Sequence, residues 1–262
     1  RGMWTAGLLN PFLDHKRKGG IINEIVGRMD KEGYMHRKTH RDCFDNEYMK
    51  YLLDQMMIES NVSIMLHQLA VDAIVDDGHI CGIITESKSG RRAILADVVI
   101  DCTGDGDISY LAGVPYEKGR PVDGLMQPMT LYFRLGNVKF ELPDKYTTYD
   151  MIMEAVEAAG VEYRLPYKTP TFMPLPLTDQ SAVQITHVYG VDGTSADDLT
   201  FAEIEGRRQI HEAVEILRKY VTQFADVQLT QSATQIGVRE TRRILGRYQL
   251  TLEDMEMGRT FE

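Results

Sequence analysis

The segment VDAIVDDGHICGIITESKSGRRAILADVVIDCTGDGD (residues 71–107) contains the pattern that decides the fold. Three runs rich in apolar and β-branched residues follow one another, at 71–75, 80–87 and 91–95. The pairs Asp77-Gly78 and Ser89-Gly90 separate them with tight-turn chemistry, so we expect an antiparallel meander. The almost wholly apolar run 97–101 then predicts a buried parallel strand, which leads into a glycine-rich loop.

The acidic loop after this run is not typical of a calcium site. Its carboxylates, on Asp101, Asp105 and Asp107, do not have the spacing of an EF-hand loop. Backbone N–H groups at a turn between a strand and a helix attract anions, but three carboxylates would repel a phosphate. They suit hydroxyl groups better, as acceptors for a ribose or a ribityl chain. A glycine turn that is merely solvated by aspartates remains the alternative.

Composition limits the class of function. The chain has 262 residues, 43% of them hydrophobic, and a net charge of −10, which argues against nucleic acid as a partner. No apolar run approaches the ~18 residues that span a bilayer, so no membrane partner is expected. The three cysteines, Cys43, Cys81 and Cys102, form no C-x-x-C pair. They suit a reducing compartment, and we expect a cytoplasmic protein.

The remaining chain predicts further helices and strands. Helices are expected at 21–29, 46–59 (with Asp45 as N-cap), 149–159 (ending at Gly160) and 200–220 (opening with a capping box from Thr200 to Glu203). Additional strands are expected at 62–66, 129–135 and 182–189. In the second of these, alternate residues are apolar. Together they indicate a mixed sheet with helices over it within 115–235, after a boundary near 115–124.

The order of meander, apolar strand and CTGDGD loop resembles FAD-dependent oxidoreductases built on the two-dinucleotide-fold flavoprotein plan. Three further stretches resemble one bacterial subfamily of FAD-dependent oxidoreductases: GMWTAGLLNPF, AGVPYEKGR with DGLMQP, and TQIGVRETRRILGRYQLTLEDM. The resemblance implies an α/β (α+β mixed) fold. A partial Rossmann-like FAD-binding domain (1–114) would be interrupted by a mixed-sheet substrate domain (115–235), with a return segment (236–262). The family's first strand and G-x-G-x-x-G loop are expected upstream of Arg1, which suggests a fragment.

The resemblance also implies the site residues. The cofactor FAD would be bound by Gly2, Met3, Thr5, Val71, Thr103, Gly104, Asp105, Gly237 and Glu240. The catalytic candidates are Arg239 and Arg242. If this segment is helical, Arg239 shares a face with Arg242 or Arg243. A guanidinium near a flavin would stabilise negative charge on the reduced ring or clamp a substrate carboxylate. Pairing of these arginines with Glu240 and nearby acids on a solvated face is the alternative.

The leading hypothesis is therefore an FAD-dependent oxidoreductase that acts on an unidentified small organic substrate. The alternatives are a carbohydrate-active or sugar-binding protein on the same fold, or a flavin-free inactive fragment. No metal site is predicted, because His36, His40 and Cys43 have metal-like spacing but no fourth ligand. His187 lies on an alternating stretch and is interpreted as a core or cleft histidine.

Overall fold

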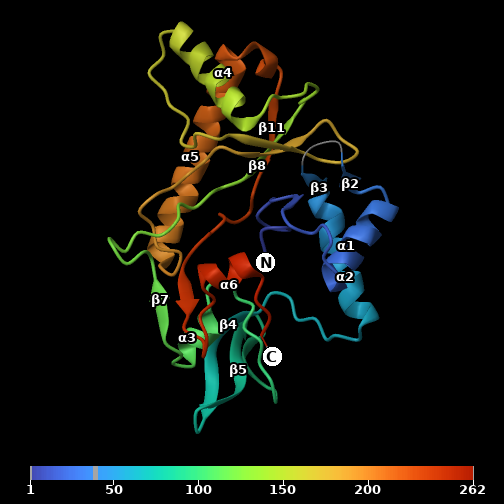
Figure 1. Ribbon diagram of the computed structural model, residues 1–262, viewed down its shortest axis with the longest axis vertical. Coiled ribbons are helices and arrows are strands. Elements are labelled where there is room, and N and C mark those ends of the chain that lie inside the picture. The colour runs from blue at the N-terminus through green and yellow to red at the C-terminus, as the bar shows by residue number, and fades with distance from the viewer. Residues whose placement is uncertain (1, 38–40, 262) are drawn as a thin grey trace. The chain divides into compact units, whose positions relative to one another are not determined.

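The computed structural model describes residues 2–37 and 41–261 (Figure 1). The chain forms two compact units. Unit 1 comprises Arg1–Ile64 and Gln127–Arg239, and unit 2 comprises Met65–Met126 and Glu240–Glu262. The domain scheme expected from the family plan places its boundaries at 114 and 235 instead, and it stays a prediction.

Unit 1 is built around an antiparallel sheet with the strand order β11-β8-β10-β9. Figure 1 labels its strands β8 and β11. Its strands are β8 (Phe133–Gly136), β9 (Thr171–Pro174), β10 (Ser181–Gln184) and β11 (Gln228–Ser232). The register places Val183 opposite Phe133, and a bulge interrupts β11 between Leu229 and Gln231. The predicted strands at 129–135 and 182–189 are thus present but shorter, and the bridge between Met129 and Val188 extends their pairing.

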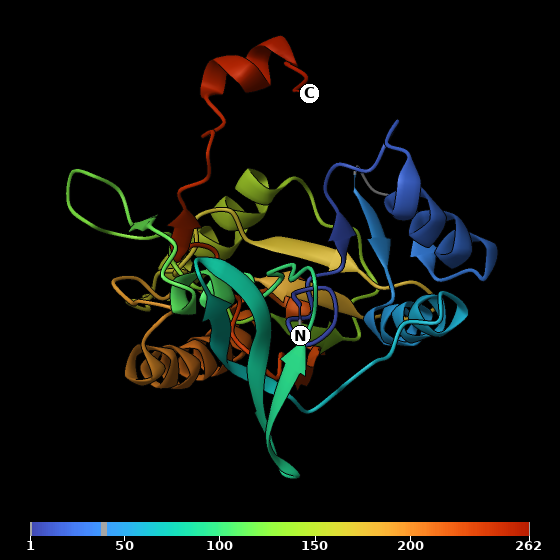
Figure 2. The same cartoon turned by 90° about the horizontal axis from the view of Figure 1, so that it is seen from below.

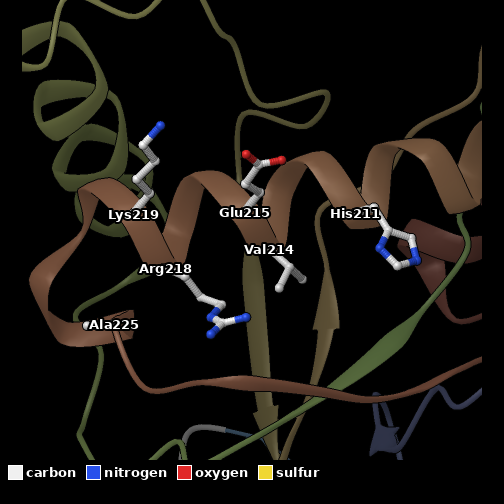
Figure 3. Close-up of a pocket in the computed structure, with 6 residues that line it drawn as sticks. All are labelled: His211, Val214, Glu215, Arg218, Lys219 and Ala225. Carbon is white, nitrogen blue, oxygen red and sulfur yellow. The ribbon is translucent and has the colours of Figure 1, made fainter.

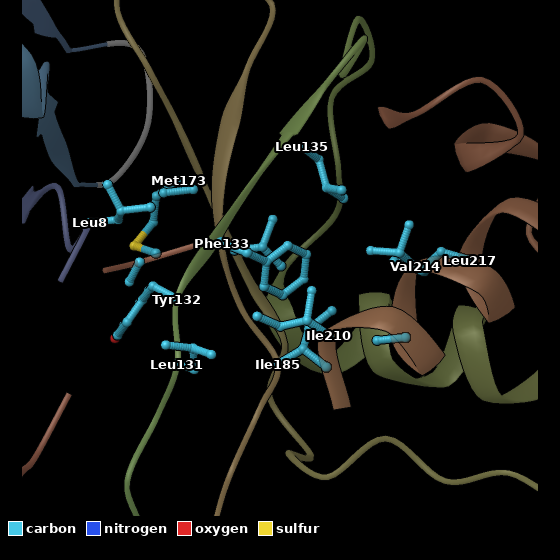
Figure 4. Packing of buried hydrophobic residues seen from close by; sticks show 14 of the residues in the cluster. Leu8, Leu131, Tyr132, Phe133, Leu135, Met173, Ile185, Ile210, Val214 and Leu217 are labelled. Carbon is cyan, nitrogen blue, oxygen red and sulfur yellow. The ribbon is translucent and has the colours of Figure 1, made fainter. Parts of the chain in front are cut away.

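The long helix α5 (Ala196–Tyr220) covers one face of this sheet, next to α4 (Lys145–Ala158) and the 3₁₀ turn η1 (Thr222–Phe224). Figure 4 shows Phe133 and Leu135 directed toward the side of β8 on which Ile210 of α5 lies. The approach is close at Gly206, where a Cβ atom would lie 2.9 Å from Cβ of Leu131.

The second face of β8 is also buried. Tyr132 lies with Leu8 and Met173 on the opposite side from Phe133 (Figure 4). Arg134 is 6% exposed and donates a hydrogen bond of 2.9 Å to Oδ1 of Asn46. The alternation expected from the sequence is therefore correct, although the polar face is covered by the N-terminal part of unit 1 instead of water.

A smaller sheet, β1-β3-β2, accompanies two helices in the N-terminal part of unit 1. These elements are β1 (Pro11–Phe12), α1 (Gly20–Lys31), β2 (Met35–His36), β3 (Asp42–Phe44) and α2 (Asn46–Glu59). A second core joins them through residues such as Phe44 and Met49. The predicted cap is confirmed, because Asp45 accepts a hydrogen bond of 2.8 Å from the backbone N–H of Tyr48.

The predicted start of α5 at Thr200 is wrong. The helix begins four residues earlier, where Ser195 accepts from the backbone N–H of Asp198. Glu203, the expected partner in the capping box, accepts instead from the backbone N–H of Ile236 at 2.7 Å. Helix α4 likewise begins before its predicted start, capped by Asp144, and Gly160 follows its end with φ +68° as expected.

Unit 2 contains the predicted meander, which Figure 2 shows as a long, twisted ribbon. Its strands are β4 (Leu69–Asp76), β5 (His79–Ser87) and β6 (Gly90–Leu95). Asp77 and Gly78 both have positive φ, as a type I′ turn requires. The unit is completed by α3 (Asp107–Leu111), β7 (Tyr116–Lys118), β12 (Arg242–Ile244) and α6 (Leu252–Met257), with β12 paired to β7. The mixed α/β class with a meander is confirmed.

The predicted strands at 62–66 and 97–101 are absent from the described structure. In the second, Val98 and Ile100 are 76% and 80% exposed. Apolar character alone does not make a strand, because the ladder hydrogen bonds need a neighbouring strand. The described residues provide none for this run. Among residues 2–37 and 41–261, no helix is both long and apolar enough to cross a membrane.

Replacing Gly82 with alanine is expected to destabilise the meander by about 1–3 kcal/mol. A Cβ atom there would clash with the backbone oxygen of Ile94 and would lie 3.0 Å from Cα of Leu95, so β5 and β6 would have to separate. Chemical denaturation and hydrogen exchange of β5 measure the effect. Gly27→Ala in α1 is the control, since nothing lies within 4 Å and alanine favours helix. Equal stability of Gly82→Ala and wild type would contradict this packing.

Candidate functional site

The CTGDGD loop of unit 2 is organised by Asp101. Its carboxylate accepts four hydrogen bonds, from the backbone N–H and the hydroxyl of both Thr103 and Ser109, at 2.7 to 3.0 Å. Burial raises the pKa of Asp101, but these donors outweigh it and lower the pKa to about 2. Asp101 is therefore ionised at neutral pH, and it holds both ends of the loop.

The return segment closes on the same loop. The hydroxyl of Thr241 donates to Oδ1 of Asp105 at 2.6 Å. Nη1 of Arg242 donates to Oδ1 of Asp107 at 2.7 Å and to the backbone oxygen of Asp105 at 3.1 Å. The guanidinium also lies 4.3 Å from the ring centre of Tyr110. The Arg242 side chain is 10% exposed, so it braces the loop, and its catalytic assignment stays a prediction.

The three arginines of the return segment do not share a helix. Arg242 and Arg243 lie on β12, where successive side chains point to opposite faces. Arg243 pairs with Glu240 and donates to the backbone oxygen of Gly119, as the solvated-face alternative expected. Arg242 pairs with the carboxylate of Asp107, which lies 135 residues away in sequence. Arg239 belongs to unit 1 and has different partners.

The features of unit 2 fit a bound FAD. All three carboxylates of the loop already have hydrogen-bond partners within the protein. The backbone N–H groups of the loop are therefore the groups that would bind the cofactor. Gly104 is exposed and has a φ of +90°. A Cβ atom there would have no neighbour within 4 Å, and the N–H of Gly104 has no partner among the described residues. Val71 lies at a shift in the β4–β5 register, between Ala70 and Asp72. A bulged residue is left out of the ladder, which leaves its backbone free for the contact with FAD that the resemblance implies for Val71.

The N-terminal cofactor candidates lie in unit 1. Gly2, Met3 and Thr5 line a hollow of about 350 Å³ together with Trp4 and Leu53. The same Met3 fills the space beside Gly237, where a Cβ atom would lie 2.7 Å from its Cε and 3.0 Å from the backbone oxygen of Thr130. Gly237 therefore allows close packing with the first residues of the chain. Its cofactor role stays a prediction.

Arg239 is fixed by three hydrogen bonds in unit 1. Nη1 donates to the backbone oxygen of Pro128 at 3.0 Å and to Nε2 of His187 at 3.1 Å. Nη2 donates to the hydroxyl of Thr130 at 2.7 Å. Arg239 remains accessible to solvent, and within residues 2–37 and 41–261 it forms no ion pair. This group of residues was not recognised as a site in the sequence, because its members are 52 and 109 residues apart.

His187 is held in a defined state beside Arg239. Burial, and the charge of Arg239, lower its pKa to about 4, so the ring is neutral at neutral pH. Because Nε2 accepts from the guanidinium, the proton is assigned to Nδ1, which lies 3.2 Å from the hydroxyl of Tyr189. The side chain of Gln209 bonds both the N–H and the C=O of His187, at 2.9 and 3.0 Å. The interpretation as a core or cleft histidine fits its 6% exposure.

A second hollow of about 380 Å³ lies along α5. Its charged lining residues include Glu215, Arg218 and Lys219. Figure 3 shows that Glu215 and Lys219 point to one side of the helix, whereas Arg218 points to the other. The charges therefore do not converge on one position. We therefore interpret this hollow as a shallow depression of the surface of α5 and not as a binding site.

The metal-like trio is only partly described. His36 lies opposite Cys43 in the register of β2 and β3, and His40 lies outside the described residues. Within the described part of the chain, no group of three histidine, cysteine or acidic side chains is arranged to hold a metal ion.

Comparisons with known proteins agree with this description. The model of the family described as FAD dependent oxidoreductase matches residues 2–262. No curated protein matches the chain. Among solved structures, the fold is similar to that of a triple mutant of the flavin-dependent brominase Bmp2, with a TM-score of 0.51 and 13% sequence identity. The match covers 86% of this chain and 57% of that chain, and at this identity it bears on the fold alone. The chain belongs to the FAD-dependent oxidoreductase family, whose cofactor is FAD.

Proposed function

We propose that the protein is an FAD-dependent oxidoreductase that acts on a small organic substrate. FAD, when bound, supplies the redox chemistry, and the protein supplies binding, orientation and electrostatics. The observation that carries the proposal is the closure of the return segment on the CTGDGD loop, through Thr241 to Asp105 and Arg242 to Asp107. It builds a rigid, glycine-containing loop in a chain of this family.

The proposed roles follow from the two units taken separately. In unit 2, Thr103, Gly104 and Asp105 hold FAD, and Val71 offers its backbone. In unit 1, Arg239 presents a positive charge that neutral partners keep in place. Gly2, Met3, Thr5, Gly237 and Glu240 remain candidate cofactor residues from the resemblance.

The sugar-binding alternative is not favoured. It relied on acidic loops that would line a sugar cleft, but the loop carboxylates of Asp101, Asp105 and Asp107 are engaged within unit 2. The family match is to a redox class. Binding or cleavage of oligosaccharides by a flavin-free preparation would revive this alternative.

The visible spectrum of the purified full-length protein tests the proposal. We expect flavin absorption, and release of FAD on denaturation. Arg242→Met removes the brace of the loop, and it is expected to weaken FAD binding at least about tenfold, because hydrogen bonds to charged groups contribute about 1.5–3 kcal/mol. Arg243→Met is the matched control, since that exposed arginine lies on the same strand. A colourless protein that FAD neither reconstitutes nor stabilises against heat would overturn the proposal.

A further inference from the structure

Arg239 has a positive charge that no described carboxylate balances. Its hydrogen-bond partners are all neutral: a carbonyl, a neutral imidazole, and the hydroxyls of Thr130 and Tyr132. By contrast, an ion pair with a carboxylate is formed by Arg207, Arg208, Arg242 and Arg243. An ordered, accessible guanidinium with only neutral partners is a typical receptor for an external anion.

Arg239 has donors beyond these three hydrogen bonds. A guanidinium has five N–H donors, and the three hydrogen bonds use three of them, so the donors on Nε and Nη2 that remain are shared between Tyr132 and a bound anion. Nε and Nη2 share one edge of the guanidinium, the edge at which a carboxylate binds through both oxygens. The hydroxyl oxygen of Tyr132 also accepts a hydrogen bond from Arg239, and the same hydroxyl can donate its proton to a bound carboxylate.

The surroundings keep this receptor in place before a ligand arrives. Thr130 is 1% exposed and His187 is 6% exposed, so these two partners lie in the folded core. The ring of Tyr167 packs at 4.1 Å from that of His187. Because the guanidinium is already ordered, less side-chain entropy is lost when the anion binds.

We infer that Arg239 binds the carboxylate group of the substrate, so that the enzyme acts on a small organic acid. This inference rests on the proposed function in one respect, namely that the bound organic acid is the substrate of an oxidoreductase. The anion-binding site itself lies within unit 1. Thr130 and His187 are positioning residues, because they act through Arg239. Tyr132 provides a hydroxyl beside the bound anion.

Calorimetric titration of the purified full-length protein with benzoate tests the inference, with benzamide as the uncharged probe. We expect benzoate to bind and benzamide to bind at least about tenfold more weakly. Arg239→Gln should weaken benzoate binding about 10- to 100-fold, since charge-assisted hydrogen bonds contribute about 1.5–3 kcal/mol. Arg239→Lys should recover only part of the affinity, because an ammonium group cannot bind both oxygens in the same way.

Arg218→Gln is the matched control, because Arg218 is also exposed and lines the hollow along α5, away from Thr130 and His187 in sequence. Equal binding of benzoate to wild type and Arg239→Gln, or an equal loss in Arg218→Gln, would overturn the inference. Inorganic phosphate that binds at Arg239 in preference to benzoate would also overturn it. A protein that contains reducible FAD but shows no such binding refutes this inference alone. A protein that binds benzoate through Arg239 but never holds FAD refutes the proposed function alone.

Discussion

Replacing Asp101 with asparagine is expected to lower the free energy of unfolding of unit 2 by about 2–3 kcal/mol and to weaken FAD binding. Asp101 accepts bonds from two N–H groups and two hydroxyls. An asparagine of nearly the same shape has one acceptor oxygen, and its NH₂ group would face donors on Thr103 or Ser109. The loop would therefore lose its charge-assisted bonds while its volume stays the same.

The effect of Asp101→Asn depends on pH. The pKa of Asp101 in the folded protein, about 2, is below its ordinary value of 3.8. A carboxyl whose folded pKa is depressed contributes stability that is fully present above the ordinary pKa and is lost as the pH falls through the folded pKa. The stability difference between wild type and Asp101→Asn should thus be constant near neutral pH and should shrink between about pH 5 and pH 2.

Hydrogen exchange of residues 101–110 and denaturant unfolding, both at pH 7 and pH 3, measure this difference. Asp97→Asn is the control, because Asp97 is exposed and has no described hydrogen bond through its side chain. A loss of protection that is the same at both pH values would show that Asp101 does not act through its charge. Equal protection in wild type and Asp101→Asn would contradict its role in the loop.

The parts of the fold that could be predicted from sequence depend on local chemistry. The turn at Asp77 and Gly78 needs positive φ at both residues, and the cap at Asp45 needs only an N–H three residues away. Both features are written in a few adjacent residues. The order of the meander strands follows from the short turns between them.

The incorrect predictions share a different cause. The run 97–101 has the composition of a buried strand, but pairing depends on a partner that adjacent residues cannot specify. The spacing of Thr200 and Glu203 fits a capping box, but the carboxylate of Glu203 accepts a hydrogen bond from the backbone N–H of Ile236 instead. In both places a tertiary contact, or its absence, overrides the local preference.

For the same reason, only part of the candidate site could be predicted from the sequence. The resemblance pointed to Arg239 and Arg242, but the sequence could not separate their roles. Asp107 neutralises Arg242 across 135 residues, whereas Thr130 and His187 orient Arg239 without neutralising it. One arginine therefore stabilises the fold of a loop, and the other keeps its charge available for an anion.

Replacing Gln209 with leucine is expected to lower the free energy of unfolding of unit 1 by about 2–4 kcal/mol. The side chain of Gln209 is 6% exposed and pairs with both the N–H and the C=O of His187. Leucine has a similar volume, so the change leaves two buried backbone groups without partners at about 1–3 kcal/mol each, offset in part by the added apolar surface.

Gln209→Glu separates the two bonds, because a carboxylate keeps the acceptor for the N–H of His187 but cannot donate to its C=O. We expect a smaller loss of stability than in Gln209→Leu. Gln235→Leu is the control, since Gln235 is exposed and its side chain has no described bond. Denaturant unfolding measures all three variants. If Gln209→Leu were no less stable than Gln235→Leu, the two bonds would not contribute to stability.

The same substitution reaches the candidate site through His187. Burial and the charge of Arg239 hold the pKa of His187 near 4, so any loosening of the chain around His187 should raise that pKa toward the ordinary value of 6.5. Histidine titration by NMR measures that pKa. Because the folded pKa is the lower one, His187 makes the wild type less stable as the pH falls below about 6.5, and Gln209→Leu should weaken this dependence. Suppose that Gln209→Leu raises the pKa of His187 and weakens benzoate binding although Arg239 is unchanged. The position of the Arg239 guanidinium then depends on Gln209, a residue of α5 that forms no described hydrogen bond with it.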